Sequence, residues 1–296
     1  MSKYVILTDS CIDLTYKQAK ELGLEAIPLS VDIEGESYFN YLDEREIRVK
    51  DFYDVLRRNL VTKTSMINPD EFVNFFKPFL KDGYDILYIG FSSALSGTYN
   101  SSMIAKEELQ EEYPDRNIVT IDSLCASMGQ GLLLTIASKL KQAGKSLEEV
   151  RDFVEENKLR VSHLFTVGDL NHLKRGGRLS SAKAFLGTVL RIKPLLHVNK
   201  EGKLVQTGST RGRKQALAKM IERMKNTIEN ASDQLVYISH GDCEEEAEEL
   251  KREIIKEIGV KEVVLNLIGP VIGSHSGLGT IAIFYLGNDR FTEYEK

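Results

Sequence analysis

Four short polar segments carry the residue types that could do chemistry. They are Thr62–Ser65, Ser92–Ser96, Lys174–Arg178 and Ser274–Ser276, the last of which surrounds His275. Hydroxyls, backbone amides, basic side chains and an imidazole can all donate hydrogen bonds to a negatively charged oxygen. The four segments therefore favour a binding site for a carboxylate or a phosphate.

Motifs for nucleophilic, nucleotide or metal chemistry are missing. Around Ser92 the sequence reads Gly90-Phe91-Ser92-Ser93-Ala94, which lacks the second glycine of the G-x-S-x-G elbow. Neither a G-x-x-x-x-G-K-[ST] loop nor a G-x-G-x-x-G fingerprint after the first predicted strand is present. The five histidines have no ligand-like pairing, so we expect no metal site. His275 stands apart because its glycine and serine neighbours allow a ligand to approach, and it suits either a ligand contact or a turn.

The serine segment follows a predicted buried strand. Asp85–Gly90 is a short apolar run bounded by glycines, which is typical of a parallel strand. A strand, a turn of small residues and a helix start place N–H groups and hydroxyls at the carboxyl end of a sheet, where open α/β sheets bind anions. Serines are also preferred helix N-caps, and one turn can serve both purposes.

Predicted strands and helices alternate through the first half of the chain. This alternation predicts a parallel sheet with helices on both faces. After about residue 160 the pattern changes, and Asn199–Gly202 predicts the turn of a β-hairpin. The first half has predicted strands at Val5–Thr8, Ala26–Ile33, Asp85–Gly90 and Ile118–Ile121, and a predicted loop at Thr62–Pro69.

Two predicted helices carry candidate linings for an apolar cavity. One contains an aromatic stripe within Phe72–Phe79, a spacing that is more typical of a core than of a ligand pocket. Pro78 should end or kink this helix. The other is predicted over Ser180–Leu190 and includes the apolar segment Phe185–Leu190.

Length and composition indicate an ordinary two-domain protein of the cytoplasm. A chain of 296 residues is long for one core, and its 42% apolar and 28% charged content is typical of a globular protein. Neither a signal peptide nor an apolar run of membrane-spanning length is expected. Cys11, Cys125 and Cys243 are far apart and suggest neither disulfides nor zinc, which fits a reducing compartment.

The basic residues are concentrated in one part of the chain. Lys174–Lys214 contains eleven lysines and arginines and one acidic residue, Glu201, so it carries a charge of about +10 within a chain of net charge -5. Such a segment is a solvated face, an anion site or a docking surface. Nucleic-acid binding is not expected, because Phe185 is the only aromatic residue in the segment.

Five motifs occur in order along the chain, namely Asp9-Ser10, Thr64-Ser65, Ser92–Tyr99, Leu173–Arg178 and Gly269–Gly279. Together they resemble those of the DegV family, whose members include the fatty-acid-binding subunits of bacterial fatty acid kinase. The resemblance spans essentially the whole chain. It implies an N-terminal three-layer α/β/α domain with a parallel sheet (residues 1–160) and a C-terminal two-layer α/β domain with a mixed sheet (161–296).

The resemblance also implies roles for individual residues. Family members bind one long-chain fatty acid in a tunnel between the two domains, which points to Thr64 and Ser93 for its carboxylate. Arg178 and Arg211 match basic positions that work with the kinase. Met66-Ile67 departs from the Gln-Pro that often follows this motif, which alters the surroundings of the headgroup. The neighbours implied at the carboxylate are Ser65, Ser92, Ser96 and His275.

The resulting hypothesis is a carrier without catalysis of its own. It binds a fatty acid such as palmitate, needs no other cofactor, and presents the carboxylate to a separate ATP-dependent kinase that forms an acyl phosphate for phospholipid synthesis. We expect no nucleic-acid partner and only transient membrane contact during lipid exchange. The alternative is a subunit of a dihydroxyacetone-kinase-like enzyme that binds a small hydroxy-ketone through His275. The preferred acyl chain, the oligomeric state and the hydroxyls that touch the carboxylate are not specified by the sequence.

Overall fold

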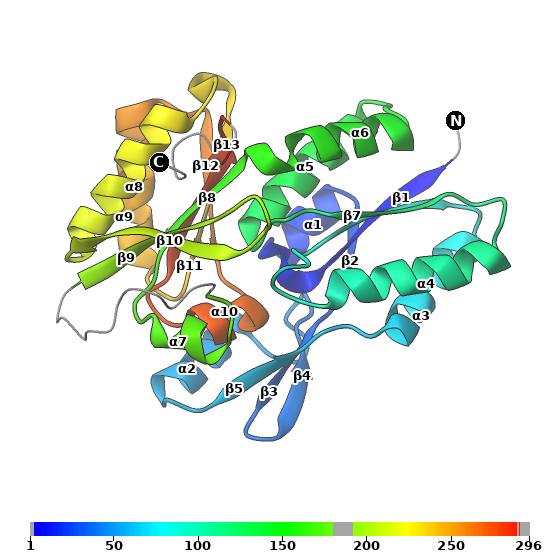
Figure 1. Cartoon of the computed structure of the whole chain (residues 1–296), viewed down its shortest axis with the longest axis horizontal. Helices are drawn as coiled ribbons and strands as arrows, with labels where there is room; N and C mark the ends of the chain where they lie inside the picture. Colours follow the sequence, from blue (N-terminus) through cyan, green and yellow to red (C-terminus); the bar gives the residue numbers. More distant parts are fainter. Residues whose placement is uncertain (1–2, 180–191, 289, 291–296) are drawn as a thin grey trace.

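The fold is built from three β-sheets joined by helices (Figure 1). The computed structural model describes residues 3–179, 192–288 and 290. The helix predicted over Ser180–Leu190, with its candidate lining segment, lies outside these residues. No described helix has both the length and the apolar character needed to cross a bilayer.

The first sheet has four parallel strands in the order β2-β1-β6-β7. Every residue of β6 is buried, as expected for a parallel strand covered on both faces. Helices α3 and α4 pack on one side, and α5 and α6 lie on the other, which confirms the predicted three-layer arrangement (Figure 1). The elements are β1 (Tyr4–Asp9), η1 (Ser10–Ile12), α1 (Tyr16–Glu21), β2 (Leu24–Ile27), α3 (Pro69–Lys81), β6 (Asp85–Gly90), α4 (Thr98–Glu112), β7 (Ile118–Asp122), α5 (Met128–Gln142) and α6 (Leu147–Asn157).

The second sheet has six strands in the order β10-β9-β8-β13-β11-β12 and is mixed, as predicted. Its β11–β12 pair is parallel and the other neighbouring strands run antiparallel. Helices α8 and α9 pack on the sheet, and α5 also contacts its strands β8, β11 and β13. We call the parallel sheet with its helices the first unit, and the mixed sheet with its helices the second unit. Helix α5 thus packs against both units. The elements are η2 (Lys158–Arg160), β8 (Val161–Thr166), α7 (Asn171–Arg175), β9 (Ile192–Val198), β10 (Leu204–Arg211), α8 (Arg213–Thr227), η3 (Ala231–Asp233), β11 (Leu235–His240), α9 (Glu244–Ile258), β12 (Glu262–Leu267), α10 (Pro270–Ser276) and β13 (Ile281–Leu286).

A small antiparallel sheet, β4-β3-β5, was not predicted. The single strand expected over Ala26–Ile33 is wrong, because Pro28 separates two strands that belong to different sheets. The loop expected over Thr62–Pro69 begins instead with β5, an edge strand without the apolar alternation that marks most strands. Helix α10 packs against β3, β5 and α2, so this sheet joins the two units. The elements are β3 (Ser30–Ile33), β4 (Glu36–Phe39), α2 (Val49–Arg57) and β5 (Thr62–Ser65).

Pro78 does not end the helix that contains it. Helix α3 continues to Lys81, although proline removes one helical hydrogen bond. Its aromatic face compensates, because Phe72 and Phe76 are fully buried and their ring centroids lie 5.2 and 5.7 Å from that of Tyr88. This part of the aromatic stripe is core, and none of its phenylalanines lines the pocket described below.

Candidate functional site

A cavity of about 280 Å³ lies between the carboxyl ends of the parallel strands, the mixed sheet and α10. We call it the apolar pocket, because most of its lining is aliphatic or aromatic. The side chains come from both units of the chain, so neither unit forms the pocket alone. Representative lining residues are Leu29, Phe91, Phe165, Leu204, Val271 and Phe284.

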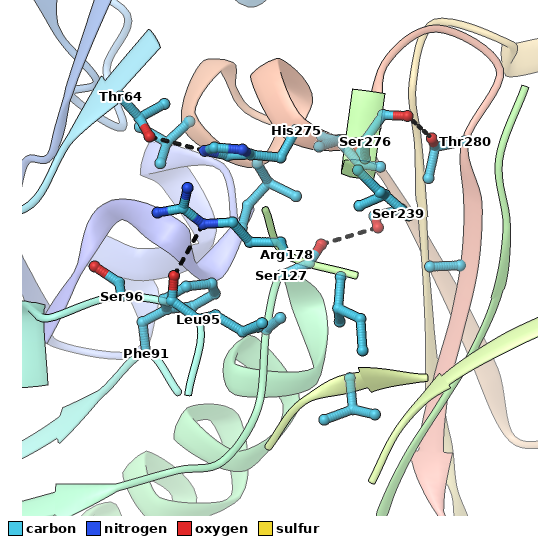
Figure 2. A pocket seen from close by; sticks show the side chains of 18 of the residues that line it. Thr64, Phe91, Leu95, Ser96, Ser127, Arg178, Ser239, His275, Ser276 and Thr280 are labelled. Atoms are coloured by element: carbon cyan, nitrogen blue, oxygen red, sulfur yellow. Dashed lines mark hydrogen bonds between the residues drawn. The ribbon is translucent and has the colours of Figure 1, made fainter. Parts of the chain in front are cut away.

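Polar side chains gather at one end of the apolar pocket. The Thr64 hydroxyl lies 2.8 Å from Nε2 of His275 (Figure 2). Arg178 lies beside them, where its Nε donates to the Leu95 carbonyl at 3.2 Å and its Nη1 donates to the Gly176 carbonyl at 2.5 Å. Ser96 also lines this end (Figure 2). The side chains of Thr64, Ser96, Arg178 and His275 form what we call the polar end.

The secondary structure explains why Thr64 and His275 meet. Thr64 lies on β5, opposite Val31 of β3, and α10 packs on both strands. Helix α10 begins with Pro270, which suits a first helical position, and ends before Gly277, whose φ is +76°. The turn predicted around His275 is therefore one short helix that delivers the imidazole to the edge strand.

The polar end is positively charged. Among the described residues that line the apolar pocket, Arg178 is the one with a formal charge at neutral pH, and no Asp or Glu belongs to the lining. Burial, together with the nearby Arg178 guanidinium, lowers the pKa of His275 to about 4. His275 is therefore neutral at pH 7. An anion placed here meets one cation and several hydrogen-bond donors.

Gly176 holds the His275 ring in place. A Cβ atom at position 176 would lie 2.3 Å from Nδ1 of His275, so the ring packs directly on the glycine backbone. Nδ1 is buried and has no hydrogen-bond partner among the described residues. Met66, which also lines the pocket, is 55% exposed, and its sulfur occupies the space that a side chain at Gly97 would need. The methionine that departs from the family motif thus lines the pocket and packs beside Gly97.

The structure places the predicted hydroxyls in two groups. Thr64, Ser65 and Ser96 line the apolar pocket, whereas Ser92 and Ser93 do not belong to its lining. The buried Ser92 hydroxyl donates to the Gly202 carbonyl at 2.9 Å. The backbone N–H of Ser93 donates to Asp122 at 3.2 Å.

The serines do not cap the following helix in the expected way. Helix α4 starts after Gly97, so no serine occupies its N-cap position, although the Ser96 hydroxyl accepts the N–H of Thr98 at 3.3 Å. The glycine that receives the Ser92 hydrogen bond is the last residue of the predicted hairpin turn. Gly202 has a φ of +74°, and a Cβ there would meet the Ser92 oxygen. The predicted hairpin is confirmed, and its tip inserts into the first unit.

A second polar cluster in the pocket wall was not predicted. The Ser127 hydroxyl donates to Asp13 at 2.5 Å and lies 3.0 Å from the Ser239 hydroxyl. Burial raises the pKa of Asp13 to about 7. The Ser276 hydroxyl, in the lining of the same pocket, is buried and has no hydrogen-bond partner within the part of the chain that the structure describes. Each of these serines comes from a different segment, so no local motif marks them.

One further histidine lies in the pocket wall, and the predicted Arg211 lies away from it. His163 lines the apolar pocket, and both of its ring nitrogens have partners, the Ala126 N–H at 3.2 Å and the Val161 carbonyl at 2.9 Å. The His163 ring is therefore held by the protein on both sides. Arg211 is exposed at the end of β10 and does not line the pocket. Within the described part of the chain, no group of three His, Cys, Asp or Glu residues could hold a metal ion.

Comparisons with known proteins agree with this arrangement. A family model described as an uncharacterised protein of the DegV family matches residues 3–288. A DegV domain-containing protein of Clostridium perfringens is 44% identical over 290 residues, which cover 98% of this chain and 99% of the relative.

Solved structures extend the likeness to the fold. A DegV family protein from Thermus thermophilus, described for its fatty acid binding, has 30% identity and a TM-score of 0.87, with 96% of this chain and 99% of that chain covered. A stearic acid-binding protein from Eubacterium ventriosum has 27% identity and the same TM-score, with coverages of 96% and 98%. The chain belongs to the DegV family.

Proposed function

We propose that this protein binds a long-chain fatty acid, with the acyl chain in the apolar pocket and the carboxylate at the polar end. The observation that carries the proposal is an apolar cavity whose one charged lining residue, among those described, is the cation Arg178. The fatty acid binding described for the Thermus thermophilus and Eubacterium ventriosum relatives supports it.

The energetics of the two ends are complementary. Each buried methylene contributes about 0.8 kcal/mol, so the acyl chain supplies most of the affinity. A carboxylate taken out of water is costly unless several donors satisfy it. The Thr64 and Ser96 hydroxyls and the neutral His275 can donate, and Arg178 adds a charge-assisted hydrogen bond.

We further propose that the bound carboxylate is presented to a separate kinase in the cytoplasm. A carboxylate oxygen attacks the terminal phosphorus of ATP held by the kinase, the new O–P bond forms, and the bond to the bridging oxygen breaks as ADP leaves. The product is an acyl phosphate for phospholipid synthesis, and lipid exchange involves transient membrane contact. In this proposal residues 1–160 carry the carboxylate loops, and residues 161–296 close the tunnel. Arg178 and Arg211 contact the kinase.

Ser93 is retained in the proposal as a residue that approaches the carboxylate when a ligand is bound. The alternative, covalent capture of a small hydroxy-ketone by His275, is disfavoured by the apolar lining of the pocket. A small polar substrate would leave most of that lining in contact with water.

Mass spectrometry of an organic extract of the purified protein tests the proposal. We expect a co-purifying fatty acid, and stoichiometric binding of palmitate after delipidation. A matched assay with hexane-1,2-diol as a small polar control should show no binding. Absence of both co-purified fatty acid and palmitate binding would contradict the proposal.

A further inference from the structure

A second cavity lies on the outer side of the polar end. Its volume is about 580 Å³, and its lining includes Lys63, His172 and Arg175. We call it the cationic cleft. The residues Thr64, Arg178 and His275 line both the cationic cleft and the apolar pocket, so these three side chains form the wall between them.

The charge of the cationic cleft exceeds what a carboxylate needs. Among the described residues, Lys63, Arg175 and Arg178 line it, against one acidic residue, Asp169. The Asp169 carboxylate accepts the backbone N–H of Asn171 at 2.9 Å, at the start of α7. None of the three cations forms an ion pair with a residue in the described ranges 3–179, 192–288 and 290.

The order of the two cavities matches the order of groups in one molecule. The apolar pocket suits an alkyl chain, the shared wall suits a carboxylate, and the cationic cleft suits a second anionic group joined to that carboxylate. A monoanion at the wall is matched by Arg178, whereas a phosphoryl group carries up to two negative charges and three acceptor oxygens. Lys63 and Arg175, beyond the wall, supply the further positive charge that such a group requires.

We propose that the cationic cleft is the subsite for a phosphoryl group attached to the carboxyl end of the bound chain. The inference rests on the proposed function, which places the carboxylate at the wall. The cleft retains the acyl phosphate after transfer, with Lys63 and Arg175 binding the phosphoryl oxygens and the alkyl chain still in the apolar pocket. The ligand class is an acyl phosphate.

Hexadecyl phosphate and palmitate, titrated separately into the delipidated protein, test this subsite. Both probes share a long alkyl chain, and hexadecyl phosphate is a stable analogue of the acyl phosphate. For Lys63→Gln and Arg175→Gln, we expect the affinity for hexadecyl phosphate to fall at least ten times more than the affinity for palmitate. The matched variants Lys261→Gln and Arg252→Gln remove one exposed cation each outside the cleft, and should change neither affinity.

The outcomes separate the subsite from the proposed function. If palmitate fails to bind the unmodified protein, the proposed function is wrong. If palmitate binds but both cleft variants lose the two probes equally, or lose neither, the subsite is wrong and the proposed function stands. Inorganic phosphate titrated into the palmitate-loaded protein forms a further arm. Binding of free phosphate that depends on Lys63 and Arg175 would assign the cleft to a phosphate from another source and would overturn the acyl phosphate assignment.

Discussion

Replacing Gly176 with alanine should disable the His275 contact without touching a polar side chain. The added Cβ would lie 2.3 Å from Nδ1 of His275, against an ordinary contact of at least 3.4 Å, so the ring must move by roughly 1 Å. The backbone itself tolerates alanine, because Gly176 has a φ of -72°. The displaced imidazole would lose its 2.8 Å contact with Thr64 and its hydrogen bond to a bound carboxylate.

The expected loss follows from the hydrogen bonds involved. A hydrogen bond to a charged group contributes about 1.5–3 kcal/mol, which corresponds to a Kd for palmitate raised roughly 10- to 150-fold. Overpacking should also lower the free energy of unfolding by about 1–3 kcal/mol. Isothermal titration with palmitate and chemical denaturation measure the two effects.

Gly177→Ala is the matched control. Gly177 has a φ of +67°, and no heavy atom of the described residues lies within 4 Å of the point that its Cβ would occupy. Alanine there therefore costs about 1 kcal/mol of backbone strain and leaves His275 in place. Palmitate affinity should stay within a factor of about two or three of the unmodified protein. Equal losses of affinity in the two variants would mean that loop distortion, and not the His275 contact, is responsible. Unchanged affinity in Gly176→Ala would refute the placement of the carboxylate beside His275.

Three further predictions concern the polar end and the buried carboxyl group. Thr64→Val should weaken palmitate binding about 10- to 150-fold, because one hydrogen bond to a charged group, worth about 1.5–3 kcal/mol, is lost, while Thr64→Ser retains binding. Fluorescence displacement measures both variants, and equal affinities would argue against a role for the hydroxyl. Arg178→Gln should weaken palmitate binding about 10- to 150-fold and leave hexadecanol binding unaffected, since only the charged ligand loses a charge-assisted hydrogen bond. Parallel losses of affinity for both ligands would indicate a packing role for Arg178. Asp13→Asn should become progressively more stable relative to the unmodified protein as pH rises from 4 to 7. The pKa of Asp13 is raised to about 7 from an ordinary 3.8, so between these pH values the folded state binds more protons than the unfolded state. The unmodified protein therefore loses stability as pH rises through this window, whereas the asparagine variant does not. Urea denaturation at pH 5 and pH 8 checks the difference, and a constant difference would contradict it.

Sequence patterns predict the parts of this fold that local chemistry determines. The buried strand β6 follows from its apolar run, and the capping box of Asn68 and Glu71 fixes the start of α3. Strand β5 escapes prediction because Thr62-Lys63-Thr64-Ser65 has no apolar alternation, and its strand state depends on pairing with β3. Pro78 misleads because the helix-breaking tendency of one residue is outweighed by the burial of its neighbours.

In the candidate site, too, the sequence predicts what local motifs determine and misses what long-range contacts determine. Motifs identify Thr64, Ser96 and His275, which do line one pocket, while their contacts with a carboxylate stay predictions. Ser92 has the same chemistry as Ser96, but its hydroxyl is bonded to a carbonyl 110 residues further along the chain. No spacing rule shows such a long-range partner. The cluster of Ser127 and Ser239 is hidden for the same reason.

Helix α5 has a consequence for how the protein matures on the ribosome. Most of its residues from Met128 to Ser138 are buried, partly against strands β8, β11 and β13, which are synthesised later. The tip at Gly202, which receives the Ser92 hydroxyl, also emerges after the whole parallel sheet. A nascent chain halted near residue 160 therefore exposes an apolar helix face and an unpaired hydroxyl. Complete folding of the first unit therefore requires strands of the second unit. A chain that stalls in the latter half of translation is incompletely folded and prone to capture by chaperones.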